Sequence, residues 1–171
     1  DREILDALPR ADRRVEFIRE SLVELDAALR ALGQHPHAGL IVRHAMASDA
    51  VPALAQALQA QAVYANHDDE PQALARDSLV RTRLALAGIA FHTFKDHTLL
   101  ERNEVLTQSG TPYSVFTPYK NAWLRTIDAF QLQSYAIERH AHRLAPRPAG
   151  ECLDIPSLPA LGRSEEHTSE L

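Results

Sequence analysis

The strongest constraint on the fold is an alternation of amphipathic helical patterns with short apolar runs. The clearest helical pattern repeats apolar residues every three or four positions between Asp12, which can cap a helix, and Gly33, which can end it. Short apolar runs at residues 40–42, 62–65 and 89–94 are typical of buried strands. This alternation predicts an α/β protein, a Rossmann-like parallel sheet with helices on both faces.

Two further helices are expected between these runs. Ser48 or Asp49 can cap one that carries apolar residues as far as Leu58. Pro71 follows three acidic residues, which are favourable near a helix N-terminus, and it suits the first turn of a helix that stops near Gly88.

The segment Gly110–Trp123 combines turn residues with aromatic side chains. Its two X-Pro steps disfavour helical conformation at Thr111 and Thr117. The apolar side chains between them exceed what a solvated loop normally carries. Pro118 then suits the first turn of a helix. The segment therefore predicts a packed connection that closes an α/β layer and leads into a helix.

Composition excludes several classes of protein. The chain has 171 residues, which is enough for one domain with a core. Its net charge of −5 argues against a nucleic-acid-binding surface within it. No apolar run approaches the roughly 20 residues of a membrane span, and no signal peptide opens the chain. The single cysteine, Cys152, suits a reducing compartment. Because no targeting signal is found, a cytoplasmic location is expected.

The domain organisation follows from changes in composition. Residues 1–130 are expected to form the α/β domain, and the proline-rich residues 131–162 are expected to form a linker to another domain. Residues 163–171 read like the translation of a common sequencing adapter, so we expect them to be foreign to the protein.

Ligands of open α/β sheets bind beyond the carboxyl ends of the strands. That rule singles out residues 43–44, 66–70 and 95–97. The sequence has no glycine-rich phosphate loop and no Gly-x-Ser-x-Gly elbow, and nothing specifies a nucleophile with its base. Chemistry alone therefore indicates an α/β domain with a ligand crevice and no catalytic residues.

No metal site is expected either. Two histidine pairs, His35/His37 and His140/His142, are spaced by two residues, and without paired cysteines or His-Glu-x-x-His they are better explained as solvated loop histidines. The acidic residues Asp68–Glu70 are explained by helix capping and the helix dipole.

Several motifs, in order along the chain, resemble the N-terminal α/β domain of DNA photolyases and cryptochromes. The segment Gly110–Trp123 is similar to the family's Gly-x-Pro-Tyr-x-Val-Phe-Thr-Pro-Tyr/Phe-x-x-x-Trp. The supporting motifs are Asn66-x-Asp68-x-Glu70-Pro71, Ala75-Arg-Asp77, Phe94-Lys-Asp96 and Glu104-Val-Leu-Thr107.

The resemblance implies an enzyme, a light-dependent deoxyribodipyrimidine photolyase that splits ultraviolet-induced pyrimidine dimers in DNA. In this family, light-excited reduced FAD donates an electron to the dimer, and both FAD and damaged DNA bind to a C-terminal helical domain. That domain and the family's first two strands are absent from this chain, so we expect no repair activity from it alone. A cryptochrome-type blue-light photoreceptor, or a nucleotide-binding α/β module unrelated to light, remains an alternative.

The resemblance also implies an antenna chromophore, a folate or a deazaflavin, that passes excitation energy to the flavin. Folate-binding members carry a glutamate near Thr111 and a histidine near Leu8, and both are absent here, which favours deazaflavin or no antenna. By similarity, four residues border the deazaflavin pocket: Asp1, Leu5, Arg14 and Asp96.

The chain departs from the family pattern at several points. Asp69 replaces a common tyrosine, and Ala45-Met-Ala47 stands where Gly-Asp-Pro is common. Loss of the first two strands would leave residues 40–42 without neighbours and the 62–65 and 89–94 strands with an unpaired edge. We therefore expect marginal stability or a rearranged sheet.

Overall fold

The computed structural model describes residues 1–33, 37–151 and 153–165. The chain divides into two compact units: Asp1–Ala47 with Ala136–Leu171 (unit 1), and Ser48–Tyr135 (unit 2). His35, Cys152 and residues 166–171 of the predicted foreign tail lie outside the described residues.

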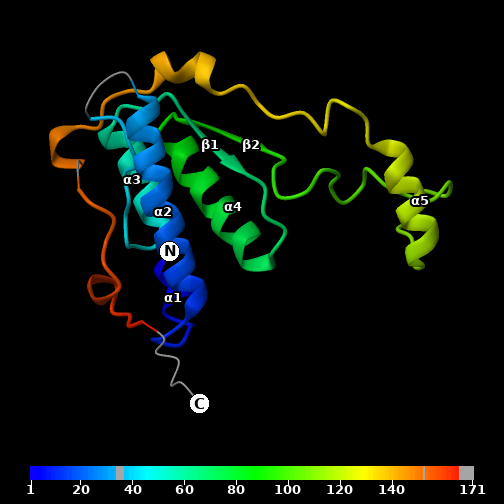
Figure 1. Ribbon diagram of the computed structural model, residues 1–171, viewed down its shortest axis with the longest axis horizontal. Coiled ribbons are helices and arrows are strands. Elements are labelled where there is room, and N and C mark those ends of the chain that lie inside the picture. Colours follow the sequence, from blue (N-terminus) through cyan, green and yellow to red (C-terminus); the bar gives the residue numbers. More distant parts are fainter. Residues whose placement is uncertain (34–36, 152, 166–171) are drawn as a thin grey trace. The chain divides into compact units, whose positions relative to one another are not determined.

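Unit 2 contains the sheet. Strands β1 (Ala62–Asn66) and β2 (Ala90–Phe94) pair in parallel, with Ala62 opposite Ala90 and Asn66 opposite Phe94 (Figure 1). The mixed α/β class, the parallel pairing and the positions of both strands are therefore confirmed.

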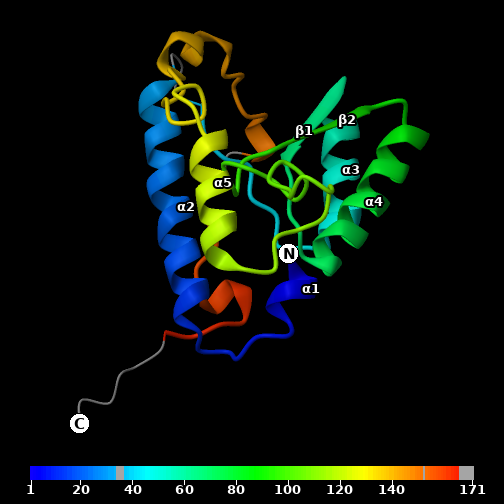
Figure 2. The same cartoon turned by 90° about the vertical axis from the view of Figure 1, so that its right-hand side faces the viewer.

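One face of the strand pair carries the hydrophobic core of unit 2. Helix α3 (Ala47–Ala57) and helix α4 (Pro71–Leu86) lie side by side in Figure 2. Leu84 of α4 is fully buried, and it packs in one cluster with Ala55, Val63 and Phe91. The opposite face exposes a row of stacked rings from Tyr64, His92 and Phe94. Alternate residues of each strand point toward the helices, and the core lies on that face of the strand pair.

Helix starts differ slightly from those expected. Helix α3 begins at Ala47, so Ser48 and Asp49 lie in its first turn rather than capping it. Helix α5 (Phe116–Thr126) begins before Pro118 and includes Thr117, which the X-Pro rule had placed outside a helix. Pro118 is still in the first turn, where a backbone N–H has no partner within the helix, so its missing donor costs nothing.

The packed connection before α5 is confirmed in part. Tyr113 packs against a small core formed by Leu100, Val105 and Ala122. The neighbouring Val115 and Phe116 are exposed, contrary to the packing expected of this apolar segment.

Unit 1 is built on helix α2 (Arg13–Leu32) and contains the short helix α1 (Arg2–Leu5) and three 3₁₀ helices, η1 (Glu138–Arg143), η2 (Ala149–Glu151) and η3 (Pro159–Leu161). The predicted cap is present, because Asp12 Oδ1 accepts a hydrogen bond of 2.9 Å from the Arg14 N–H. Gly33 ends α2 as expected. Close packing explains why this residue is a glycine, since a Cβ there would lie 2.3 Å from the Cβ of Ala38.

The apolar face of α2 is less buried than its pattern predicts. Ile18 is 57% exposed and Leu25 is 47% exposed, whereas the adjacent Asp26 is only 6% exposed. Asp26 Oδ1 accepts a hydrogen bond of 2.7 Å from the Leu40 N–H, and its Oδ2 lies 2.7 Å from the guanidinium of Arg30. Burial alone would raise the pKa of Asp26, but these donors hold it below its usual value.

The strand predicted at residues 40–42 is wrong. These residues form no strand, and both backbone polar groups of Leu40 bond to side chains instead. Its N–H donates to Asp26, and its carbonyl accepts from Arg147 Nη1 at 3.0 Å. A strand needs a neighbouring backbone to satisfy these groups, and here a buried carboxylate and a buried guanidinium take that place.

A glycine makes this arrangement possible. Gly39 has φ of +138°, and a Cβ there would lie 2.5 Å from Asp26 Oδ1. Gly39→Ala should therefore lower the free energy of unfolding by about 1–3 kcal/mol, because it adds backbone strain and displaces the buried carboxylate. Urea denaturation followed by circular dichroism measures the change.

The matched control is Gly150→Ala, where an added Cβ meets no atom within 4 Å. This variant should leave the urea midpoint nearly unchanged. Equal effects of the two substitutions would contradict the role assigned to Gly39.

Candidate functional site

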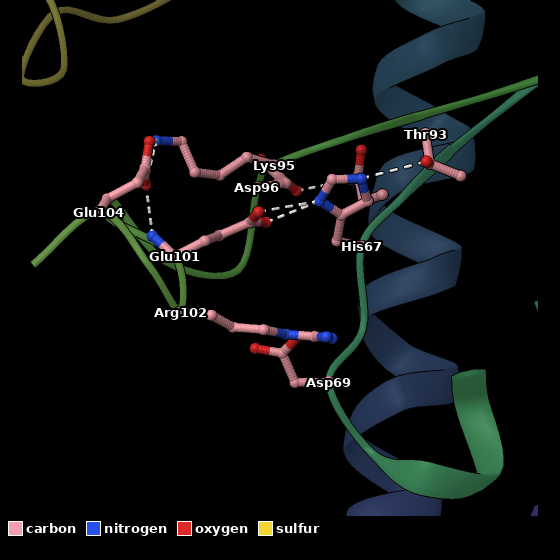
Figure 3. Close-up of polar contacts among 9 residues, drawn as sticks. His67, Asp69, Thr93, Lys95, Asp96, Glu101, Arg102 and Glu104 are labelled. Atoms are coloured by element: carbon pink, nitrogen blue, oxygen red, sulfur yellow. Dashed lines mark hydrogen bonds and ion pairs between the residues drawn. The ribbon is translucent and has the colours of Figure 1, made fainter. Parts of the chain in front are cut away.

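The carboxyl ends of β1 and β2 in unit 2 meet a polar loop, as the strand-end rule predicts. His67 directly follows β1, and its backbone N–H donates to the Phe94 carbonyl at 2.7 Å. The loop after β2 brings Glu101, Arg102 and Glu104 to the same place (Figure 3). Together these residues line a cleft of about 440 Å³.

His67 links the two strands and the loop. Its Nδ1 lies 2.8 Å from Glu101 Oε1, and its Nε2 lies 3.1 Å from the Thr93 hydroxyl (Figure 3). An ionised carboxylate only accepts hydrogen bonds, so Nδ1 donates to Glu101, and Nε2 and the Thr93 hydroxyl share the second hydrogen bond. No pattern in the sequence predicts this contact, because the three residues are far apart along the chain.

The order of hydroxyl, imidazole and carboxylate is that of a nucleophile, a base and an orienting acid. Acyl transfer also needs donors that stabilise a developing oxyanion. The space beside His67 is instead lined by Asp68, Asp69 and Glu70, whose carboxylates would repel negative charge. We therefore interpret the His67 contacts as fastening the loop to the strands.

Two ion pairs reinforce this attachment. Arg102 Nε donates to Asp69 Oδ1 at 2.6 Å, and Lys95 Nζ lies 2.7 Å from both oxygens of Glu104 (Figure 3). Asp69 raises the pKa of Arg102, and the hydrogen bond from Lys95 lowers the pKa of Glu104. Five charged or ionisable side chains of the cleft, His67, Asp69, Glu101, Arg102 and Glu104, are thus each bonded to a neighbouring side chain. Among the described residues, no group of three or more His, Cys, Asp or Glu side chains is placed to hold a metal ion.

A second cavity lies within unit 1 and differs in chemistry. It has a volume of about 230 Å³ and is lined mainly by aliphatic side chains of α1, α2 and the C-terminal segment. Its polar lining comes from Asp1, Arg19, Arg43 and His44. Of the strand-end groups predicted from sequence, Arg43 and His44 therefore belong to this cavity, although no strand precedes them.

The structure brings together two of the four residues proposed for an antenna pocket. Asp1 and Leu5 line the unit 1 cavity. Arg14 instead pairs with Asp12, at 2.6 Å between Nη2 and Oδ2, and its side chain is 70% exposed. Asp96 belongs to unit 2, where its carboxylate accepts a hydrogen bond of 2.6 Å from the Asn66 amide.

Sequence reasoning missed three residues that line the cavity from the C-terminal segment. Ile155, Pro156 and Leu161 lie in the region interpreted as linker. Their apolar character was the available signal, but without a helical or strand period it gave no position. His140 and His142, in the same region, are exposed, as expected of solvated histidines.

The first residue of the predicted foreign tail is well packed. Arg163 Nη1 donates to the carbonyls of Leu8 and Pro9 at 2.8 and 2.7 Å. The foreign origin of residues 163–171 stays a prediction, which the coding DNA can test.

Comparison with known proteins identifies the family. The family model described as DNA photolyase matches residues 3–142. The chain therefore belongs to the DNA photolyase family, whose members generally depend on a flavin and act on DNA.

The relatives carry two kinds of name. A deoxyribodipyrimidine photo-lyase of Synechococcus is 35% identical over 72% of this chain, and one of Halobacterium salinarum is 38% identical over 66% of it. A cryptochrome DASH of Natronomonas pharaonis is 30% identical over 92% of the chain. The matched regions cover 25%, 23% and 31% of these relatives, so the chain spans about a quarter to a third of their length.

Within the described part of the chain, no helix is both long and apolar enough to cross a membrane.

The Asp12–Arg14 pair predicts a specific pH dependence. The hydrogen bond from Arg14 lowers the pKa of Asp12 from 3.8 to about 2. A depressed folded-state pKa stabilises the fold above pH about 4, and this contribution is lost as the pH falls toward 2. Asp12→Asn keeps a good helix cap but removes the titration. Its melting temperature should therefore fall less steeply than that of the parent between pH 4 and pH 2.

Asp154→Asn is the control, because the Asp154 side chain is fully exposed. Melting curves that fall equally steeply for parent and Asp12→Asn would show that the Asp12 carboxylate makes no such contribution.

Proposed function

We propose that this chain is the antenna-binding part of a light-dependent deoxyribodipyrimidine photolyase, which repairs ultraviolet-induced pyrimidine dimers in DNA. The observation that carries the proposal is the family match over residues 3–142, together with relatives that bear this enzyme's name. In the whole protein, FAD and damaged DNA would bind to a helical domain, in the cytoplasm. When bound in its reduced form and excited by light, FAD would supply the electron that opens the dimer and would take it back after the ring bonds break.

The unit 1 cavity is the proposed place for the antenna chromophore. Its aliphatic walls suit the faces of a planar ring system, and exclusion of water from such a site favours a fixed orientation. Its volume of about 230 Å³ lies below the range of roughly 300–1,000 Å³ typical of ligand pockets, so a three-ring chromophore would fill it and extend beyond it. Arg43 and His44 can donate hydrogen bonds to the polar edge of the ring.

Within this cavity, Asp1 and Leu5 are the residues that we propose to bind the antenna. Asp1 Oδ1 accepts hydrogen bonds from the N–H groups of Glu3 and Ala47, which holds the carboxylate at the start of α1. Leu5 packs at the end of the same helix. A deazaflavin fits this apolar lining, and it is the chromophore that we favour over folate.

Ligand binding tests the cavity directly. We expect 5-deazariboflavin to bind the chain with a change in its fluorescence, and Leu5→Glu to weaken binding at least tenfold, because it places a charge in the apolar lining. Leu5→Met keeps an apolar side chain at this position and should bind 5-deazariboflavin about as tightly as the parent. Leu79→Glu, on an exposed position of α4 in unit 2, should leave it unchanged. Unchanged affinity in Leu5→Glu would remove the cavity from consideration as the antenna site.

Repair is tested in a photolyase-deficient bacterium that carries the gene with its flanking coding sequence. We expect survival after ultraviolet exposure to rise under blue light and not in the dark. The cryptochrome relatives, one of which matches 92% of this chain, support the alternative of a blue-light photoreceptor. Light-dependent spectral changes without any gain in survival would favour that alternative.

A further inference from the structure

The C-terminal segment of unit 1 forms one wall of the proposed antenna cavity. Residues 147–151 and 153–161, here called the strap, run alongside helix α2 (Figure 1, orange to red). Ile155, Pro156 and Leu161 of the strap line the cavity opposite aliphatic residues of α1 and α2. The sequence pattern assigned this stretch to an interdomain linker, so its place in the wall of a cavity is unexpected.

A buried arginine holds the beginning of the strap. Arg147 is 7% exposed, and its backbone N–H and Nε both donate to the His37 carbonyl, at 2.9 and 3.2 Å. Its Nη1 donates to the Leu40 carbonyl at 3.0 Å and lies 3.9 Å from Asp26 Oδ1. This end of the strap is therefore fixed by a network that includes the buried carboxylate of α2.

The far end of the strap is also fixed, because Leu158 is 8% exposed and Arg163, two residues beyond Leu161, donates to the Leu8 and Pro9 carbonyls. The stretch between the two ends is held by weaker contacts. Glu151 forms an ion pair with Arg43, and both side chains are partly exposed. The Pro156 carbonyl accepts a hydrogen bond of 3.0 Å from Arg19 Nε. Arg19 and Arg43 also line the cavity, so two of its four polar lining residues hold the strap.

The contrast between the buried anchors and the weaker contacts of the middle of the strap affects how the strap can move. Partly exposed ion pairs and single hydrogen bonds each contribute only about 1 kcal/mol or less. The portion of the strap around Ile155 can therefore open while Arg147 and Arg163 stay in place. A ligand in the cavity contacts α2 and the strap together, so it binds the closed form better than the open one.

We propose that the middle of the strap is a lid on the antenna cavity, anchored at Arg147 and at Arg163 and closed by the chromophore, so that ligand binding and strap docking strengthen each other. The proposal rests on the proposed antenna function. It makes Ile155 and Pro156 part of the ligand site and Glu151 a positioning residue that acts through Arg43.

Hydrogen exchange with the 171-residue chain tests the coupling. With 5-deazariboflavin at ten times its Kd, amide exchange in residues 153–161 should slow about tenfold. A ligand that binds only the closed strap lowers the equilibrium constant for opening by the factor 1 + [L]/Kd. Exchange in β2 of unit 2 serves as the internal reference.

Glu151→Gln is the informative variant, because Glu151 does not line the cavity. It should speed exchange of residues 153–161 in the ligand-free chain and weaken 5-deazariboflavin binding about two- to fivefold, as expected for loss of one partly exposed ion pair. Glu138→Gln makes the same change of charge at an exposed position of η1 and should alter neither property. Circular dichroism melting confirms that both variants fold.

The outcomes separate this proposal from the antenna function. Ligand binding without slower strap exchange, and with equal affinity in Glu151→Gln, would overturn the lid and leave the antenna proposal intact. Absence of 5-deazariboflavin binding in the parent would overturn both the deazaflavin site and the coupling. The lid is supported if the ligand slows exchange of the strap in the parent and slows it less in Glu151→Gln.

Discussion

The buried carboxylate of Asp26 is the constraint on which the rest of unit 1 depends. A charge removed from water is stable only when donors surround it, and here they come from three parts of the chain: the Leu40 N–H, Arg30 and Arg147. Because each donor must reach one carboxylate, helix α2, residues 37–40 and the beginning of the strap are fixed together. The same requirement explains a glycine at position 39, where the backbone passes too close to the carboxylate for a side chain.

The two candidate sites show how differently polar groups can be used. In unit 2, His67, Asp69, Lys95 and their partners bond to one another, and their chemistry is committed to holding a loop against the strand ends. In unit 1, polar residues surround an apolar cavity and hold one of its walls. The second arrangement leaves space with aliphatic walls, which is what an aromatic ligand requires. Hence membership in the DNA photolyase family and the geometry of unit 1 support the same proposed function.

Much of the unit 2 fold was predictable, because its elements satisfy local rules. Strand β1 and helix α4 lie where apolar runs, Pro71 and Gly88 placed them, and parallel pairing follows from their alternation. The sites were less predictable. Asp1 and Leu5 line one cavity, whereas Arg14 is drawn to the nearby Asp12. Short-range charge pairing decided the position of Arg14, and no motif reports such a competition.

The sequence by itself determined the α/β class, the family, and the helices and strands whose periodic side chains encode them. The tertiary structure alone decided that residues 40–42 form no strand, that Asp26 is buried beside an exposed apolar face, and that a proline-rich stretch walls a cavity. The physical reason is the range of the interactions. Helical and strand periodicity acts over a few residues. The hydrogen bond between Arg147 and Leu40 joins residues 107 positions apart, and the ion pair between Asp26 and Arg147 joins residues 121 positions apart.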